Sequence, residues 1–363
     1  FSHSIPSGYQ KLNSQNLAAC TVSNPKDYHN TVIYTGNRTA RSITGVGFQP
    51  DWVWTKCFSN SGDHFIHDSN RGVQKNLNAN DDGQEATTSQ GLQSFDSDGF
   101  TMGILGGMNF NNQSYVHWLW KCNGGTTASN SNGTITSTVQ VNTDAGFSIV
   151  TYTGVGATRT VGHGLGAAPK WIVIKNRNKG AGEGWVVYHG KNTDAPETDG
   201  LHLNLTNATN DDTDYFSDQA VSSTIFGVSG DDRSGGSYNY VAYCFLEKPG
   251  YSKFGRYLGN GNNDGPFIYT GFKPAWFLLK NTSATQNWYL FDTSRSPFNP
   301  SNSAQQVSGS SAEETGYPMD FLSNGFKIRH NDNAWNGNGN NFVYMAFAEH
   351  PFVTSNGTPN NAR

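Results

Sequence analysis

The sequence predicts an all-β protein made of three tandem antiparallel β-sandwich repeats of roughly 100 residues each. Three observations predict this fold. One long motif occurs three times, the apolar runs are short, and glycine is frequent, with 42 of the 363 residues. Short strands joined by many polar turns are typical of sandwiches with thin cores.

The first element of the motif is an apolar run that begins with tryptophan and ends in lysine. It occupies residues 52–56, 171–175 and 276–280, and each lysine follows the tyrosine of a Tyr-x-Gly start by 22, 23 and 23 residues. Successive apolar positions indicate strands with both faces covered. We therefore expect the three tryptophans, Trp52, Trp171 and Trp276, in equivalent buried positions.

Two further elements complete each copy. The second motif occupies 64–68, 185–189 and 288–292, and the closing aromatic run occupies 115–120, 240–245 and 342–347. Glycine and Asn-Gly punctuation every 8 to 12 residues or so favours short strands and hairpins.

These elements divide the chain into six segments. We predict an N-terminal arm or linker at 1–30, repeats at 31–122, 145–250 and 251–352, a linker with an extra strand at 123–144, and a tail at 353–363. The linker begins with a polar, glycine-rich stretch that we expect to be flexible. The short joint between the second and third repeats predicts a semi-rigid rod or a compact cluster.

Composition excludes several partners. The net charge of −4 without a block of like charges argues against nucleic acid, and no apolar run is long enough to insert into a membrane. The four cysteines, Cys20, Cys57, Cys122 and Cys244, stand at positions that the repeats do not share. We expect free thiols, as in a protein that folds in a reducing cytosol.

The repeated lysines, Lys56, Lys175 and Lys280, have two interpretations. They form an anionic-ligand site, or they are strand-end lysines that prevent the strand from slipping and cover an aromatic ring with their stems. We favour the second.

The best polar candidates for a binding site are two Asp-x-x-Arg pairs, Asp68 with Arg71 and Asp292 with Arg295. Such a pair presents a donor fork to a sugar hydroxyl or carboxylate, or it braces its own loop. The second repeat has His189 in this place, which favours bracing. Trp335, in an Asn/Gly-rich loop, adds an exposed aromatic side chain to the candidates.

No catalytic signature is present, and we expect no catalytic residue, metal or cofactor. The loops at 78–83 and 260–265 resemble the start of an EF-hand but lack its closing glutamate, so we interpret them as Asx turns. Paired carboxylates for glycoside hydrolysis could still converge in space.

Several long motifs resemble one family: Gly47-Phe-Gln-Pro-Asp-Trp, Phe95-Asp-Ser-Asp-Gly-Phe100, Gly146-Phe-Ser-Ile-Val-Thr-Tyr-Thr-Gly154, Val161-Gly-His-Gly-Leu-Gly-Ala-Ala-Pro-Lys170 and Phe347-Ala-Glu-His-Pro-Phe352. Together they resemble the repeat region of large virion-associated, tail-fibre-like proteins of marine tailed bacteriophages. In such proteins this region often follows a SPRY-like domain, and Ile5 to Leu17 resembles the exit from it. Phe1 would then be the start of a fragment.

The resemblance implies a virion structural protein, part of a tail fibre, head fibre or similar appendage, assembled in the host bacterial cytoplasm. Its expected partners are other virion proteins, further copies of itself, with a trimer favoured, and host surface glycans. A stand-alone carbohydrate-binding adhesin is the alternative, and a glycan-degrading enzyme the third. An adhesin predicts aromatic side chains flanked by amides and Asp in a shallow groove, and an enzyme predicts a deep cleft with two facing carboxylates.

Overall fold

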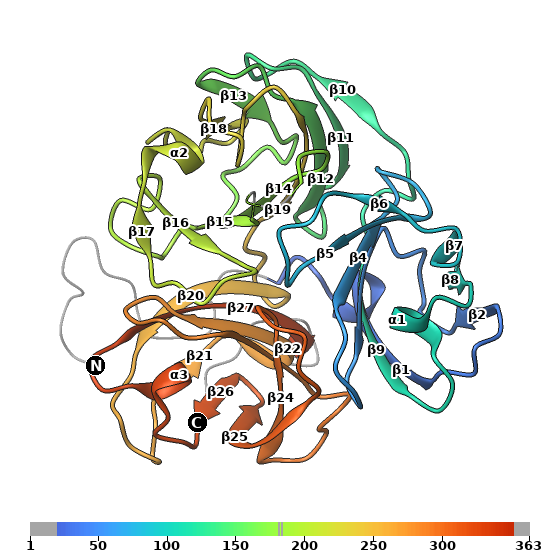
Figure 1. Ribbon diagram of the computed structural model, residues 1–363. Helices are drawn as coiled ribbons and strands as arrows, with labels where there is room; N and C mark the ends of the chain where they lie inside the picture. Colours follow the sequence, from blue (N-terminus) through green and yellow to red (C-terminus); the bar gives the residue numbers. More distant parts are fainter. Residues whose placement is uncertain (1–19, 181, 183, 352–363) are drawn as a thin grey trace.

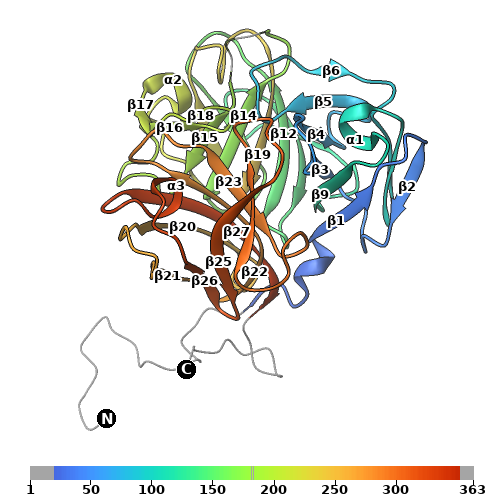
Figure 2. The same ribbon diagram turned by 60° about the horizontal axis from the view of Figure 1, so that its bottom comes forward.

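Strands dominate the computed structural model, which describes residues 20–180, 182 and 184–351 and has three lobes around a common axis (Figure 1). The lobes also lie side by side in the tilted view of Figure 2. The arrangement is the compact cluster, not the rod. The all-β, antiparallel prediction is confirmed.

Lobe 1 follows a single turn of 3-10 helix at Pro25–Asp27. Its elements are β1 His29–Thr35, β2 Arg41–Thr44, β3 Trp52–Cys57, β4 His64–Asp68, β5 Lys75–Asn78, β6 Ala86–Thr87, β7 Leu92–Asp96, β8 Gly99–Met102, α1 Gly106–Asn109 and β9 Ser114–Trp120. A main sheet in the order β1-β9-β3-β4-β5-β6 is covered by the small sheet β2-β8-β7.

Lobe 2 repeats this plan. Its elements are β10 Ala128–Asn130, β11 Ser137–Asn142, β12 Phe147–Thr153, β13 Arg159–Gly162, β14 Trp171–Asn176, β15 Val186–His189, β16 Asp199–His202, β17 Asn210–Asp211, α2 Thr213–Phe216, β18 Ile225–Val228 and β19 Asn239–Phe245. The main sheet has the order β10-β11-β12-β19-β14-β15-β16-β17, and β13 pairs with β18. Residues of the segment 123–144 thus contribute two strands to this sheet.

Lobe 3 differs in its second layer. Its elements are β20 Ser252–Leu258, β21 Phe267–Tyr269, β22 Phe272–Asn281, β23 Trp288–Asp292, β24 Ser301–Gln306, β25 Glu314–Leu322, β26 Gly325–Ile328, α3 Asn333–Asn336 and β27 Asn341–Pro351. One sheet, β20-β27-β22-β23-β24-β25-β26-β21, curls around the lobe's own core into a near-barrel instead of a two-sheet sandwich.

The same four strands lie next to one another in every lobe. The order is first strand, closing strand, tryptophan strand and second-motif strand, as β1-β9-β3-β4, β12-β19-β14-β15 and β20-β27-β22-β23. The register is also shared, because Trp52 pairs with Trp120, Trp171 with Phe245 and Trp276 with Phe347.

Both faces of the tryptophan strands are buried, as predicted. In β3, Trp52 and Trp54 face a central core shared by all three lobes, while Val53 faces the core of lobe 1. Trp171 and Trp276 join the same central core. Side chains alternate along a strand, so one uninterrupted apolar run serves two cores.

The connector between lobes 1 and 2 differs from the expected flexible linker. Gly124 and Gly125 adopt positive φ angles of 60° and 78°, and their N–H groups point to the buried carboxylate of Asp51, at 3.0 Å each. The N–H of Cys122 donates to the same carboxylate at 2.7 Å. The glycines provide a backbone geometry that wraps the anion, which holds this stretch in place.

Candidate functional site

The three repeated lysines are fully buried at the contacts between lobes. The ammonium groups donate to main-chain carbonyls as follows: Lys56 to Gly62 at 2.6 Å and Ser310 at 3.1 Å, Lys175 to Asp82 at 3.0 Å, and Lys280 to Asn281 at 2.7 Å and Thr206 at 3.2 Å. Lobe 1 thus reaches lobe 3, lobe 2 reaches lobe 1 and lobe 3 reaches lobe 2. Burial lowers the pKa of Lys56 to about 8 and that of Lys280 to about 7. A head group enclosed in this way has no surface to offer an anionic ligand.

The first residue of the second motif makes a parallel set of contacts. In cyclic order, His64 Nε2 lies 2.8 Å from the Gln306 carbonyl, Trp185 Nε1 donates to the Asn78 carbonyl at 2.8 Å, and Trp288 Nε1 donates to the His202 carbonyl at 2.7 Å. The direction is the same as that of the lysines. Two positions of one repeat therefore make the same interlobe contacts three times.

The pair Asp68 and Arg71 braces its loop and joins lobe 1 to lobe 2. The guanidinium contacts Asp68, donates to Glu85 at 3.0 Å and donates to the Ile66 carbonyl at 3.0 Å. Asp68 also accepts a hydrogen bond from the Tyr243 hydroxyl of lobe 2 at 2.6 Å. Both charged side chains are completely enclosed.

Asp292 and Arg295 repeat the arrangement between lobes 3 and 1. Arg295 Nε donates to Asp292 at 2.6 Å and the guanidinium reaches Glu313 at 3.3 Å. Trp118 Nε1 of lobe 1 donates to Asp292 at 3.0 Å. In lobe 2, His189 takes this place, and its Nε2 lies 3.0 Å from the Tyr344 carbonyl of lobe 3. The geometry is that of loop bracing, and it places no donor fork at the surface.

Trp335 is not the exposed aromatic that the sequence suggested. It is 2 % exposed and lies in the core of lobe 3, with its ring centroid 4.3 Å from that of Tyr317 and 4.6 Å from that of Tyr289. The short helix α3 turns the ring inward, and an Asn/Gly-rich sequence gives no sign of that turn.

The two EF-hand-like loops are Asx turns, as interpreted. Asp81 accepts from the Gly83 N–H at 2.9 Å, and Asn260 and Asn262 accept from the residues two positions on, at 3.0 and 2.9 Å. Among the described residues, no group of three or more His, Cys, Asp and Glu side chains is placed to hold a metal. Within the same part of the chain, no helix is long and apolar enough to cross a bilayer.

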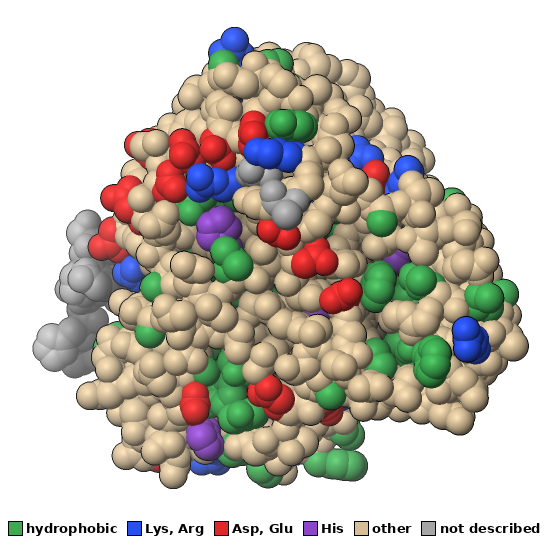
Figure 3. Space-filling view, viewed as in Figure 1, with side chains coloured by type: hydrophobic (Ala, Val, Ile, Leu, Met, Phe, Trp, Pro, Cys, Tyr) green, Lys and Arg blue, Asp and Glu red, His purple; other side chains and the backbone are tan. Residues whose placement is uncertain are grey.

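Surface chemistry differs between lobes 1 and 2 (Figure 3). Acidic side chains gather around α2 and β17 of lobe 2, where Arg233 pairs with Asp212, Asp214 and Asp231. Hydrophobic side chains gather over α1 of lobe 1.

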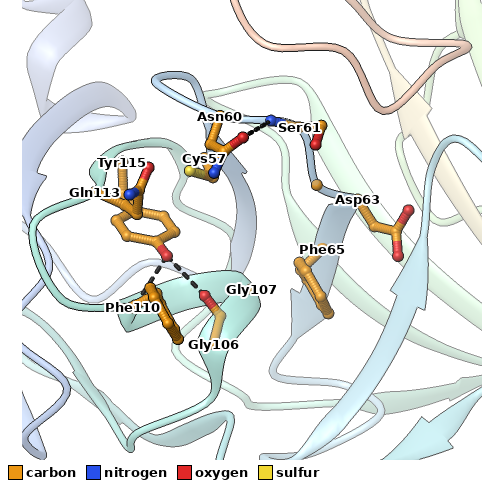
Figure 4. Close-up of a pocket in the computed structure, with 11 residues that line it drawn as sticks. Cys57, Asn60, Ser61, Asp63, Phe65, Gly106, Gly107, Phe110, Gln113 and Tyr115 are labelled. Carbon is orange, nitrogen blue, oxygen red and sulfur yellow. Dashed lines mark hydrogen bonds between the residues drawn. The ribbon is translucent and has the colours of Figure 1, made fainter.

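Beside α1 lies a groove of about 410 Å³ that we call the lobe 1 groove (Figure 4). Its lining residues come from the end of β3, the β3–β4 loop, the start of β4, α1, the α1–β9 loop and the start of β9: Cys57, Asn60, Ser61, Gly62, Asp63, Phe65, Gly106, Gly107, Phe110, Gln113 and Tyr115. Aromatic rings, two side-chain amides and one carboxylate thus share one open site.

The binding-site candidates predicted from the sequence do not include these groove residues. They lie in two separate stretches, 57–65 and 106–115, and belong to one lobe, so no repeated motif marks them. One signal was available in the alignment of the repeats, because Cys57 stands where the other two copies have Asn176 and Asn281.

Fold and site together define a three-lobed all-β protein whose recurring polar residues join the lobes. The chain belongs to a family described as a domain of unknown function (DUF7483), whose model matches residues 24–351, a span that contains all three lobes. No curated protein matches the chain.

Proposed function

We propose that this protein is a structural module of a bacteriophage virion, part of a tail fibre, head fibre or similar appendage that contacts host surface glycans. The observation that carries the proposal is that the recurring polar residues join the lobes to one another. Lys56, Lys280, Asp68 and Asp292 all lie buried at contacts between lobes. The polar residues that the repeats share therefore hold the lobes together rigidly. Such rigidity is expected of a virion appendage that bears mechanical load and displays a binding surface.

Rigid appendages of this kind work as symmetric assemblies with other virion proteins, and we propose a homotrimer assembled in the host bacterial cytoplasm. All four cysteines lie within the described residues and are free thiols, which is compatible with folding in that compartment. Large exposed apolar side chains, including Leu258 at 59 % and Val155 at 51 %, supply surface that an assembly would cover.

The test is to find the chain in the intact particle. Electron microscopy of purified virions carrying an epitope tag on this protein should place the tag on an appendage, and native mass measurement should give a trimer. A monomer at micromolar concentration, with contacts in the particle below about 1,000 Å² of total buried area, would contradict the assembly proposal.

A stand-alone carbohydrate-binding adhesin is the second candidate, and the lobe 1 groove favours it. Absence of the chain from particles, combined with binding of the isolated protein to cells, would favour this candidate. Hydrolysis is less well supported, since the groove is lined by a single carboxylate, Asp63, where a glycosidase needs two.

A further inference from the structure

We propose that the lobe 1 groove is a saccharide-binding site for a neutral glycan, with Phe65 and Phe110 as apolar walls and Asn60 and Gln113 as hydrogen-bonding partners. The inference deepens the glycan contact in the proposed function and rests on it for the source of the ligand. Binding by the purified protein does not depend on whether the chain belongs to a particle.

Lobe 1 differs from the other two lobes at a position whose side chain joins two loops in those lobes. In lobe 2, Asn176 accepts from the N–H groups two and three positions on and donates to the Asp232 carbonyl at 2.8 Å. In lobe 3, Asn281 does the same and donates to the Asn333 carbonyl at 2.7 Å. Each asparagine thereby joins the loop after the tryptophan strand to the loop before the closing strand.

Cys57 takes this position in lobe 1. Its sulfur lies 3.9 Å from the Ser59 hydroxyl, and a thiol has neither the reach nor the paired donor and acceptor of an amide. The Gly106 carbonyl corresponds to the one that the asparagines bind, and the Tyr115 hydroxyl donates to it at 2.6 Å. In lobe 2 the Tyr240 hydroxyl makes the same bond to the Asp232 carbonyl at 2.9 Å, so lobe 1 lacks only the amide donor. The lobe 1 groove lies between these two loops, where the asparagine bridge would cross.

Phe65 and the neighbouring Tyr115 are held in place. The Phe65 ring rests directly on Gly107, because a Cβ added there would lie 2.2 Å from the ring. Tyr115 is fixed by its bond to Gly106 and by the Phe110 N–H, which donates to its hydroxyl at 2.8 Å. Phe110 is 45 % exposed. The Arg38 guanidinium lies over this ring, 5.4 Å from its centroid, and the remainder of the ring faces solvent. An exposed aromatic surface costs hydration free energy, and the C–H face of a sugar ring would cover it.

The polar groups suit hydroxyls. Gln113 accepts from the Ser59 hydroxyl at 2.9 Å, and Asn60 accepts from the Ser61 N–H at 2.8 Å. Those bonds orient both amides, and no described residue accepts from their NH₂ groups. Amide N–H groups donate to the lone pairs of a sugar hydroxyl.

Charge selects a neutral ligand. The lining residues include the Asp63 carboxylate and no arginine or lysine. The guanidinium of Arg38 lies nearby but stacks on the Phe110 ring, 5.4 Å from its centroid. Asp63 is therefore the charged side chain that lines the groove, and it disfavours an anionic ligand. Lys56 precedes Cys57 in β3, but its ammonium is fully buried against the carbonyls of Gly62 and Ser310. The volume of about 410 Å³ falls within the usual range of small-molecule sites and gives room for a short oligosaccharide segment.

The test uses the full chain and a panel of neutral oligosaccharides built from glucose, galactose, mannose and N-acetylglucosamine, with sialylated and sulfated oligosaccharides as anionic comparisons. Saturation-transfer NMR and calorimetric titration should detect binding of at least one neutral sugar. Phe110→Ala should lower its affinity roughly tenfold or more, as expected when an aromatic contact is removed from a binding site.

Two variants make the result specific. Phe298→Ala is the matched control, since it removes an exposed phenylalanine from lobe 3 and should leave binding unchanged. Cys57→Asn should restore the bridge to Gly106, narrow the groove and weaken binding without lowering the melting temperature. The proposal is overturned if no neutral sugar binds at millimolar concentration, if the anionic sugars bind better, or if Phe298→Ala weakens binding as much as Phe110→Ala. Location of the chain in virions without sugar binding would leave the structural role standing and reject the glycan site.

Discussion

Buried lysines and histidines are the residues whose role is least visible from their chemistry alone. Lys56 and Lys280 end a strand, yet their ammonium groups cross to a neighbouring lobe and bind main-chain carbonyls. An amine in this position loses its hydration, and burial therefore lowers its pKa. The buried lysines join the lobes, and their lowered pKa values make the free energy of unfolding depend on pH.

Lys280→Met should change the pH dependence of stability. The folded pKa of about 7 lies below the usual 10.5, so between these values the unfolded chain binds more protons than the folded one. The contribution of Lys280 is present above pH 10.5 and is lost as pH falls toward 7, with a slope of up to about 1.4 kcal/mol per pH unit. Urea unfolding at pH 7 to 10 should show a shallower rise in the variant than in the wild type.

Lys253→Met is the matched control for that experiment. Lys253 is partly exposed and pairs with Glu247, so its removal should leave the slope unchanged. An identical slope in Lys280→Met and the wild type would contradict the assignment of a lowered pKa to Lys280.

At the level of the element, the tryptophan strand is the centre of each lobe. It lies between the closing strand and the second-motif strand, and its alternate residues reach the central core and the lobe core. In β22, the Trp276 ring centroid lies 5.3 Å from that of Trp120 of lobe 1 and 5.8 Å from that of Phe347. One strand thus connects the packing of two lobes.

Trp276→Ala should cost roughly 3 to 5 kcal/mol of unfolding free energy, because the surrounding rings of two lobes cannot collapse fully into the space left behind. Chemical denaturation followed by circular dichroism measures this. Phe298→Ala, which removes a ring that is almost entirely in solvent, should change the same quantity by less than about 0.5 kcal/mol. Similar losses in the two variants would show that Trp276 does not hold the lobes together.

At the scale of the whole molecule, neutral histidines are distributed through the central core and the lobe cores. Burial lowers the pKa of His29, His67 and His117 to about 3 and that of His189 and His202 to about 4. His29 lies between Trp120 and Phe347, and its Nε2 has no hydrogen-bond partner among the described residues.

The protein should therefore lose stability in mild acid. Each of these histidines has a folded pKa below the usual 6.5, so its contribution is present above pH 6.5 and is lost as pH falls toward 3 or 4. The loss is up to about 1.4 kcal/mol per pH unit for each group. Denaturation midpoints measured from pH 7 to pH 4 should fall steeply.

His29→Phe should reduce this acid sensitivity, because it keeps the stacked ring and removes one titrating group. His350→Phe, at an exposed position, should not. If the midpoint falls equally steeply in wild type and His29→Phe, another group carries the acid sensitivity.

Whether a feature of this protein can be predicted from the sequence depends on how far apart along the chain the residues that determine it lie. Strand identity, antiparallel pairing and the threefold repeat were predictable, because side-chain alternation and turn residues act over a few positions along the chain. The contact between Asp68 and Arg71 is likewise a local feature, since the two residues are three positions apart.

What the tertiary structure alone decided is how the three repeats use those residues. Burial of Trp335, immobilisation of Gly124 and Gly125 by Asp51, and the cyclic contacts of the lysines all depend on partners many residues away. The lobe 1 groove likewise forms between two distant stretches of the chain, 57–65 and 106–115. The pattern of residues along the chain determined that this protein is a triplicated β fold. Contacts between distant segments decided that its shared polar residues face inward and that one lobe has an open groove.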